Sequence, residues 1–571
     1  MRASSTSNSI SSNELGDSSF NSSGYCSSTQ SEPFTSDESQ KITLDSIINN
    51  YGYGFEVWKI LISVFFCFLI NGYLTTSLSS FVIPYQDYFS LTEAQISFLG
   101  TAFFITKFIS SCTIGYQTNL LSRIIIIKLA IFVTFFLVAI NAIFLNYPVL
   151  MIVQIGAGFA AGIFEIASFN IACEFTPTNY RGWIMISIWN GYNIGVLFPN
   201  LIMLFIMPDY KPLFKENEKL TDNIPIRNRL QVTLFFVAIV IFVFGTFCLI
   251  FLKDSPRNLI LTGKFREAFK ILKKMVKKKL TKQMKKDIIR DIIVHKSDSE
   301  VAKKKRVDIR HPHTPKEEMA KVSDVFAKGM CGTGILLVFI CFFGNCINDG
   351  FQLVLNLLLD KIYEGDSPEI RKKILHDNIL INSICLPSNF FLGIFTEFKF
   401  LGRKYTQFLG FIILGGFIAP IIFDKDHAYI YLIFFMFFTC ITNMVNVYVA
   451  EIYPTKTRDM ALGVIQAVGY FGSCISQFLF VFLNELGVDA GSIAFLALCV
   501  LNGLLSLFLK VDTYQRPLDA EEESEEDQYK AMIEKIGEFP DKDEDTEEDN
   551  KRKQETAGHV INSIDPNIPP L

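Results

Sequence analysis

The chain alternates long apolar runs with short polar segments between about residues 52 and 518. Each run supplies about 20 residues or more, the helix length needed to cross the hydrocarbon core of a bilayer. A soluble protein of this size would show shorter apolar runs and several domains. We therefore predict an all-α integral membrane protein with twelve transmembrane helices. These helices begin near Val57, Ser97, Ile124, Val149, Gly182, Leu230, Gly329, Asn378, Tyr405, His427, Met460 and Asp489.

The distribution of charge predicts how the protein is oriented in the membrane. Half of the residues are hydrophobic (50%), and the net charge is only −4. Lys and Arg are concentrated at 253–329, for example in "KKMVKKKLTKQMKK", and in loops on the same side of the predicted helices. The first loop on the opposite side, "YQDYFSLTEAQ", has two acidic residues and no basic one. By the positive-inside rule, both termini and the central linker are expected to be cytoplasmic.

The apolar runs form two groups, separated by the basic linker and flanked by polar tails. We predict a disordered Ser-rich tail at 1–50 and a disordered acidic tail at 511–571, because neither buries enough apolar surface to fold. Residues 51–252 are predicted to be an N-terminal six-helix bundle and 329–510 a C-terminal one. Residues 253–328 form the cytoplasmic linker, in which "KFREAFKILKKMVKKKL" predicts an amphipathic helix.

One charged motif occurs twice, each time directly after an apolar run. The chain reads "EFTPTNYR" at 174–181 and "EIYPTKTR" at 451–458, with Glu, Pro-Thr and Arg at the same spacing. The first motif follows the fourth predicted helix and the second follows the tenth. The repeat therefore indicates two pseudo-symmetric six-helix halves, an architecture that recurs among transporters.

With "GRK" at 402–404, "KDSPRNLILTGKFREA" after the sixth helix and "VDTYQRPL" after the twelfth, the chain resembles the major facilitator superfamily over roughly residues 52–518. Within it, "YGYGFEVWK", "ACEFTPTNYRG" and "NDGFQL" resemble the synaptic vesicle glycoprotein 2 and related-protein group, near the organic ion and sugar-porter-like transporters. The short segment at 360–377 lacks a glycosylation sequon, so the related proteins without a long external loop are the better comparison.

The resemblance implies a cytoplasmic latch of carboxylates and guanidinium groups at the helix ends. A carboxylate at that depth is costly unless it is paired, and guanidinium groups pair with it bidentately. Such a cluster would hold one conformation and break in the other. Alternatively, these residues only anchor helix ends. The expected members are Glu174, Arg181, Arg123, Glu451, Arg458, Arg403, Lys404, Asp254 and Arg257.

The chain departs from the superfamily pattern in three places. The loop after the second helix carries Asn119 and Ser122 where relatives have Asp and Gly. In the second half, Lys399 is assigned to the Asp position ahead of "GRK". Asn71 stands in the first helix where several proton-coupled relatives carry an acid, and an amide does not exchange a proton near pH 7.

Three ionisable residues lie deep inside apolar runs: Lys107, Glu165 and Asp349. Charges at that depth mark functional sites by default, although a purely structural Lys107–Glu165 pair is the alternative. Amides on the same helices either bond neighbouring helices or line a polar cavity, and we expect Gly350 to break the seventh helix as an external gate. The predicted cavity residues are Lys107, Glu165, Asn193, Asn345, Asn348, Asp349, Gln352 and Asn443.

These features predict a monomeric carrier of a small polar or charged organic solute, working by alternating access in the plasma membrane or a vesicle membrane. One alternative is a membrane protein that transports little and acts through cytoplasmic partners or kinases at its tails. Another is a neutral sugar uniporter. The chain shows no nucleotide-binding loop and no metal-ligand spacing, so we expect no enzyme activity, no cofactor and no nucleic-acid partner.

Overall fold

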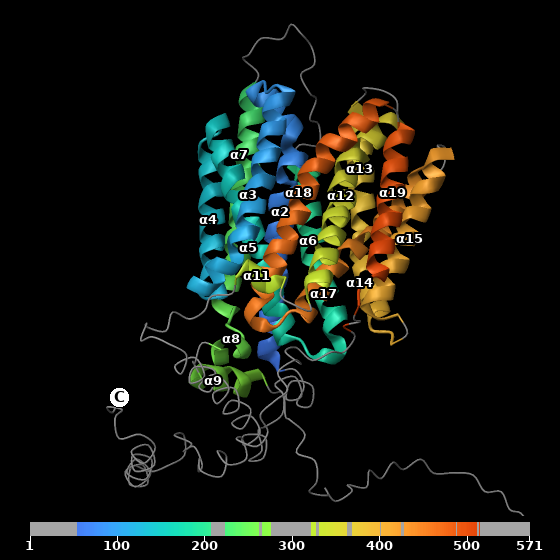
Figure 1. The fold of residues 1–571 in the computed structure, drawn as a ribbon. Coiled ribbons are helices and arrows are strands. Elements are labelled where there is room, and N and C mark those ends of the chain that lie inside the picture. The colour runs from blue at the N-terminus through green and yellow to red at the C-terminus, as the bar shows by residue number, and fades with distance from the viewer. Residues whose placement is uncertain are drawn as a thin grey trace, which may run out of the picture. The chain divides into compact units, whose positions relative to one another are not determined.

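The computed structural model describes ten stretches of the chain, all within one compact unit, Ile42–Leu571. The predicted tails lie outside the described residues, apart from Thr513, and so does most of the basic linker. Within the described part every element is a helix, which confirms the all-α fold class (Figure 1). The described stretches are 54–206, 223–261, 265–275, 321–326, 330–362, 368–399, 401–423, 428–486, 488–510 and residue 513.

Helices of the first half pack mainly on one another, and those of the second half do likewise. The N-terminal half comprises α2 (Phe55–Phe89), α3 (Glu93–Leu120), α4 (Arg123–Ile143), α5 (Tyr147–Phe175), α6 (Arg181–Ile206) and α7 (Asn223–Phe251). The C-terminal half comprises α12 (Cys331–Ile362), α13 (Pro368–Ser383), α14 (Cys385–Thr396), α15 (Gly402–Phe423), α16 (Ala428–Thr439), α17 (Met444–Ile452), α18 (Thr455–Leu486) and α19 (Val488–Leu507).

Eight described segments are long and apolar enough to cross a bilayer by length and composition. They lie on α2, α3, α4, α5, α7, α12, across α13 and α14, and across α16 and α17. The helices α6, α15, α18 and α19 pack in the same two halves without meeting those limits. All twelve predicted starting points fall on or next to one of these helices, but the count of twelve spans stays a prediction.

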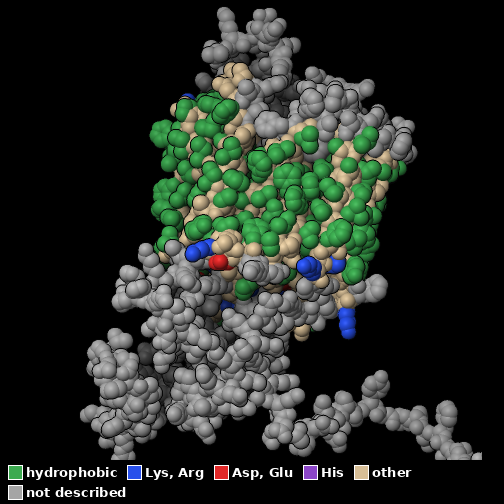
Figure 2. All heavy atoms as spheres, in the orientation of Figure 1, with side chains coloured by type: hydrophobic (Ala, Val, Ile, Leu, Met, Phe, Trp, Pro, Cys, Tyr) green, Lys and Arg blue, Asp and Glu red, His purple; other side chains and the backbone are tan. Residues whose placement is uncertain are grey.

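Apolar side chains on the outside of the halves fit a lipid environment. Along α4, the exposed residues Ile125, Leu129, Phe132 and Phe136 recur every three or four positions. That spacing puts them on one face of a helix, while the opposite face is buried against α5 and α7. Figure 2 shows hydrophobic side chains over most of the described helical face, with most of the visible basic side chains near its lower end.

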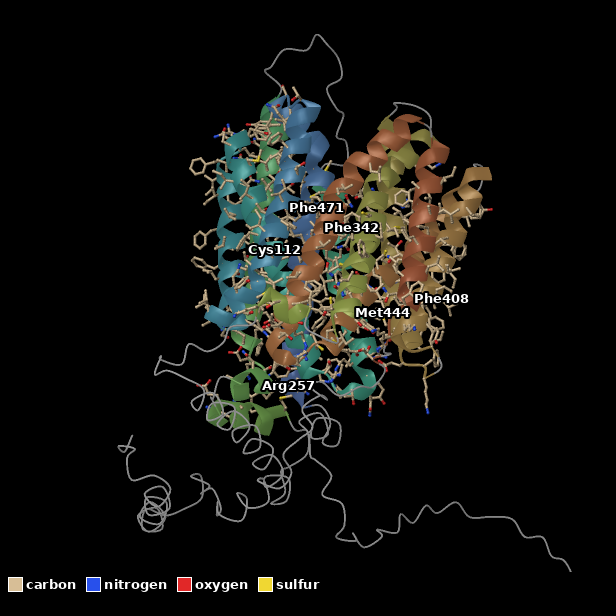
Figure 3. All side chains as sticks on the ribbon, in the orientation of Figure 1. Cys112, Arg257, Phe342, Phe408, Met444 and Phe471 are labelled. Atoms are coloured by element: carbon tan, nitrogen blue, oxygen red, sulfur yellow. The ribbon has the colours of Figure 1, made fainter. Side chains whose placement is uncertain are left out.

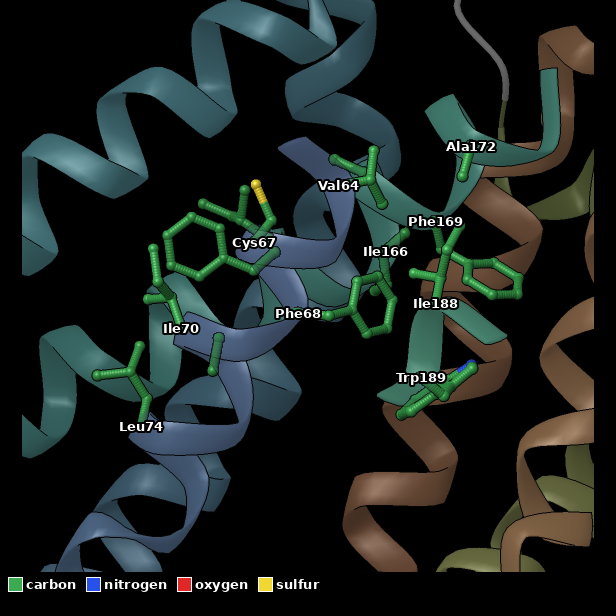
Figure 4. Close-up of a cluster of buried hydrophobic side chains, with 14 of the residues drawn as sticks. Val64, Cys67, Phe68, Ile70, Leu74, Ile166, Phe169, Ala172, Ile188 and Trp189 are labelled. Atoms are coloured by element: carbon green, nitrogen blue, oxygen red, sulfur yellow. The ribbon is translucent and has the colours of Figure 1, made fainter. Parts of the chain in front are cut away.

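Glycines allow α2 and α6 to pack backbone against backbone. A Cβ at Gly72 would lie 2.1 Å from the carbonyl oxygen of Tyr192, and one at Gly195 would lie 2.2 Å from that of Leu69. Around this crossing, aromatic and aliphatic side chains of α2, α5 and α6 fill the interior, among them Phe68 (Figure 4). The first half therefore has a closely packed core on which its polar residues are held.

The two halves meet along α3 with α18, and along α6 with α13 and α14. The linker helices α8 (Pro256–Leu261) and α9 (Phe265–Met275) lie at one end of the bundle, where the Gly54 N–H donates to the carbonyl of Met275 at 2.6 Å. We call this end the linker end. Figure 3 shows Arg257 there, whereas Phe342 and Phe471 lie farther along the helices.

Three predictions about local structure need correction. The expected break at Gly350 is wrong, because α12 runs unbroken through it as a 32-residue helix. The tenth predicted helix is instead interrupted, since a 3₁₀ turn at Cys440–Asn443 separates α16 from α17. The eighth is also divided, at Ile384 between α13 and α14. A single glycine thus did not predict a helix break here, because the packing of α12 against α18 and α19 outweighs the low helix propensity of glycine.

Candidate functional site: charged groups between the two halves

At the linker end, four charged side chains form a cluster that crosses between the halves. The Arg123 guanidinium lies 2.7 Å from the Glu174 carboxylate and 2.6 Å from the Asp459 carboxylate. Arg458 lies 2.9 Å from the same oxygen of Glu174. Asn170 donates a further hydrogen bond to Asp459 at 2.5 Å. We call Arg123, Glu174, Arg458 and Asp459 the interhalf cluster.

Two of these ion pairs join different halves. Arg123 and Glu174 belong to α4 and α5, whereas Arg458 and Asp459 belong to the first turns of α18. The formal charges sum to zero, and the four side chains are at most 8% exposed. At this burial, each charge depends on its partners, because removing one partner leaves another charge desolvated. The cluster therefore holds the halves together at the linker end.

Prolines position the repeated motif at the two helix junctions. In the first copy α5 ends at Phe175, and Pro177 precedes the 3₁₀ turn that leads into α6 at Arg181. In the second copy α17 ends at Ile452, and α18 begins directly after Pro454. A proline cannot continue a helix but suits the start of the next one. This sequence order puts Glu at a helix end and Arg near the next helix start, as expected.

A second cluster lies around Arg403 in the C-terminal half. Its guanidinium makes a two-pronged contact with Glu451, at 3.1 and 3.3 Å, and donates to the carbonyl of Thr396 at 2.6 Å. Thr513, beyond α19, donates at 2.6 Å to Oε2 of Glu451, the oxygen that also accepts from Nε of Arg403. Arg403 and Thr513, the described hydrogen-bonding partners of Glu451, thus lie in its own half, whereas Glu174 also contacts Arg458 of the other half.

Glu397, which sequence reasoning overlooked, connects this second cluster to the N-terminal half. Its carboxylate accepts a hydrogen bond from the backbone N–H of Trp183, in the first turn of α6, at 3.0 Å. A carboxylate at this position also suits the positive end of the helix dipole. Burial raises the pKa of Glu397 above its ordinary value, although nearby Arg403 opposes that shift. The acid that makes this contact stands two residues before Lys399, the residue assigned to the Asp position of the superfamily pattern.

The remaining expected latch residues make other contacts in the described structure. Asp254 accepts hydrogen bonds from the Ser122 hydroxyl within the N-terminal half, at 2.7 and 2.9 Å. Arg181 donates to the carbonyl of Thr176 at 3.4 Å, and Arg257 is buried on α8. Lys404 points elsewhere, with its ammonium 5.7 Å from the Tyr405 ring. The structure brings together Arg123, Glu174 and Arg458 with Asp459, and Arg403 with Glu451; the side chain of Asn119 lies outside the described residues.

Farther along the helices, Lys107 and Glu165 form a buried ion pair. The ammonium of Lys107 on α3 lies 2.9 Å from a carboxylate oxygen of Glu165 on α5, and the side chains are 4% and 8% exposed. The amide of Asn71 donates to the same oxygen at 3.2 Å. Across the interface, the ring of Tyr470 on α18 lies 4.3 Å from the ammonium of Lys107. Asn71, which stands where several proton-coupled relatives carry an acid, thus donates a hydrogen bond to the Glu165 carboxylate on α5.

Asp349 on α12 is held differently. Its carboxylate accepts hydrogen bonds from the Ser473 hydroxyl at 2.5 Å and from the Asn348 amide at 3.1 Å. Among the described residues, no Lys or Arg nitrogen lies within 4.0 Å of it. Asp349 is half-buried, whereas Lys107 and Glu165 are buried.

The predicted amides divide between helix packing and the interface. Asn345 donates to Gln466 on α18 at 3.3 Å, so it joins helices of one half. The side-chain nitrogen of Asn193 on α6 is buried beside the Cys440 thiol of the C-terminal half, which is only a weak hydrogen-bond partner. Asn443 is half-buried at the end of the 3₁₀ turn, and the side chain of Gln352 lies outside the described residues.

Sequence reasoning missed the partners more often than the charges. Asp459 directly follows the repeated motif, so an acid in the first turn of the eleventh helix was the available signal. Tyr470 and Ser473 carried no signal, because an aromatic or a hydroxyl in an apolar helix is ordinary. Only the packing of α18 against α3 and α12 gives them their places.

Comparison with known proteins agrees with this geometry. The family profile "Major Facilitator Superfamily" matches residues 64–366, and "Sugar (and other) transporter" matches residues 366–523. The synaptic vesicle 2-related protein of Rattus norvegicus is 22% identical over 494 residues, covering 83% of this chain and 82% of its own length. The Xenopus laevis protein of that name is 20% identical over 513 residues, with coverage of 86% and 84%.

Among solved structures, the proton:xylose symporter XylE bound to 6-bromo-6-deoxy-D-glucose has a TM-score of 0.63 at 17% identity, covering 82% of this chain and 98% of that one. A partially occluded inward-open form of XylE from E. coli has a TM-score of 0.56 at 16% identity, with coverage of 78% and 96%. At such identities the likeness shows the fold alone. With the family match over more than half of its length, this chain belongs to the major facilitator superfamily and is a multi-pass membrane transporter.

Proposed function

We propose that the protein moves a small polar or charged organic solute by alternating access, with its binding site between the halves. Lys107, Glu165 and Asp349 form the charged part of this site, and amides such as Asn193 supply hydrogen bonds. The interhalf cluster acts as the gate at the linker end, which we propose is the cytoplasmic end because the basic loops lie there. In the state described, this gate is closed.

The observation that carries the proposal is the division of opposite charges between the halves. Arg458 with Glu174, and Arg123 with Asp459, form only while the linker ends of α5 and α18 are in contact. The halves can separate there only by breaking both pairs. The protein is therefore expected to switch between two discrete packed arrangements rather than to deform continuously. Charged groups buried farther along the same interface provide electrostatic partners for a solute that binds between the halves.

A specific observation also favours a second candidate, a neutral sugar carrier. The profile for sugar and other transporters covers residues 366–523, and the sugar-bound XylE structure shares the fold. The amides around Asn345 are suited to hydroxyl groups, whereas the buried charges of Lys107 and Glu165 are not required for a neutral solute.

Reconstitution into liposomes tests the proposal. Uptake of choline, succinate, glucose and xylose is measured with labelled solutes, and saturable flux of at least one is expected. Glu165→Gln should abolish this flux because Lys107 then loses its counter-charge, whereas Glu56→Gln, far from the interface, should retain it. Flux of glucose or xylose that survives Glu165→Gln would favour the sugar carrier. Equal leak from protein-containing and empty liposomes for all four would contradict a transport function.

A further inference from the structure

The charges between the two halves do not balance. Lys107 and Glu165 neutralise one another at 2.9 Å. Asp349 has only the Ser473 hydroxyl and the Asn348 amide as hydrogen-bonding partners, and neither carries a charge. Lys107 and Glu165 both lie within electrostatic range of Asp349, where they act with opposite signs. Because Lys107 is already paired with Glu165, Asp349 has no ion-pair partner of its own among the described residues.

Such a carboxylate is costly in a membrane interior unless a cation reaches it. The Ser473 and Asn348 hydrogen bonds fix its position but supply no counter-charge. Asp349 is also the most accessible of the three ionisable groups, since Lys107 and Glu165 are only 3% and 6% exposed. A solute entering between the halves therefore meets Asp349 rather than the completed Lys107–Glu165 pair.

We propose that the transported solute is an organic cation whose positive group is received by Asp349; this inference rests on the function proposed above and narrows its substrate class. The surroundings suit an ammonium group. Tyr470 already presents its ring to one ammonium, that of Lys107, at 4.3 Å, and aromatic faces attract cations. Its buried hydroxyl lies beside the Glu165 carboxylate and adds a polar atom to the same part of the interface.

The other solute classes fit less well. An organic anion would meet two carboxylates and one ammonium, and that ammonium is already paired with Glu165. A neutral sugar would find donors and acceptors among the amides but would leave the charge of Asp349 uncompensated. Asp349 is therefore the residue that sets the preferred charge of the solute.

A matched set of probes isolates charge from shape. Choline, 3,3-dimethylbutan-1-ol and 3,3-dimethylbutanoate share a compact branched end but are cationic, neutral and anionic. Binding of each to the full-length protein in lipid nanodiscs is measured by the shift in thermal unfolding, together with tetraethylammonium and a primary amine as further cations. We expect the cations alone to stabilise the protein. Asp349→Asn should weaken their binding about 10- to 100-fold, the range for one charge-assisted bond.

Two further variants separate the role of Asp349 from folding. Asp349→Glu keeps the charge and should retain cation binding within a few-fold. Glu56→Gln removes a carboxylate that is paired with Lys59 and Lys253 at the start of α2, away from the interface, and should leave binding unchanged. If Asp349→Asn fails to fold, loss of binding in Ser473→Ala with recovery in Ser473→Thr gives the same information, because that hydroxyl positions the carboxylate.

Several outcomes would overturn the inference: stabilisation by the neutral or anionic probe equal to that by choline, no shift with any cation, or cation binding unchanged in Asp349→Asn. Saturable uptake of glucose or succinate together with such a result would refute the substrate class while keeping the transporter. Absence of uptake for all four liposome solutes would instead count against the proposed function.

Discussion

Replacement of Asp459 by Asn should loosen the linker end of the bundle. Asp459 accepts hydrogen bonds from Arg123 and Asn170, both in the opposite half, at 2.6 and 2.5 Å. Asn has the same shape and keeps an acceptor oxygen, but it lacks the charge. The substitution thus changes the interhalf cluster from neutral to net positive without creating a cavity.

The size of the effect follows from the partners that remain. Arg123 keeps Glu174 at 2.7 Å, so its guanidinium is not left without a carboxylate. The loss is therefore closer to one charge-assisted hydrogen bond, about 2–3 kcal/mol, than to the larger cost of stranding a buried charge. A change of that size shifts a two-state equilibrium by about 30- to 140-fold toward the form in which the linker end is open.

Hydrogen–deuterium exchange measured by mass spectrometry in nanodiscs reports this opening without added labels. Peptides covering 170–181 and 451–462 should exchange faster in Asp459→Asn, whereas peptides from the α2–α6 contact, such as 64–74, should not change. Asp254→Asn provides a matched control, because it removes a carboxylate at the same end that bonds Ser122 within one half. Equal exchange in Asp459→Asn and the wild type, or equal acceleration in Asp254→Asn, would refute the reasoning.

Three further predictions concern stability, each read from thermal or denaturant unfolding. Lys107→Met alone should destabilise the protein by about 3–5 kcal/mol because it strands Glu165, while Lys107→Met with Glu165→Gln should recover most of that loss; no recovery would argue against a pair. Arg403→Lys should cost about 1.5–3 kcal/mol, since an ammonium cannot reproduce the guanidinium fork, and an unchanged midpoint would contradict the two-pronged contact. Gly72→Ala should block folding, because its Cβ would meet backbone at 2.1 Å, whereas Gly332→Ala, with open space around it, should be tolerated.

Hydrophobic patterning predicted the helices well, because a bilayer imposes length and composition on each span regardless of its neighbours. It also predicted where the charged motifs would lie, since proline and the helix ends are local features. The Glu174 position at the end of α5 and Arg181 at the start of α6 are examples. Local rules failed where packing decides, as at Gly350, which remains inside a continuous α12.

The sequence alone did not predict which charged residues would pair with one another. The sequence put Glu174, Arg123 and Arg458 in one expected latch without saying which would pair, and the structure shows Glu174 in contact with both arginines, which come from different helices. Asp459 is 336 residues from Arg123 along the chain, and only the approach of α18 to the N-terminal half brings them together. Charges that must be buried can be recognised from their position, but their counter-charges depend on tertiary contacts.

The unequal partners of the two repeated glutamates limit what symmetry can predict here. Glu174 bonds across the interface, whereas Glu451 is bound by Arg403 and Thr513 on its own side. The two copies of the motif therefore share Glu, Pro-Thr and Arg but make different contacts. Constructing the opposite conformation by exchanging the geometries of the repeats would therefore require Glu451 to exchange its contact with Arg403 for one across the interface, and equivalent substitutions at the two positions should produce different defects.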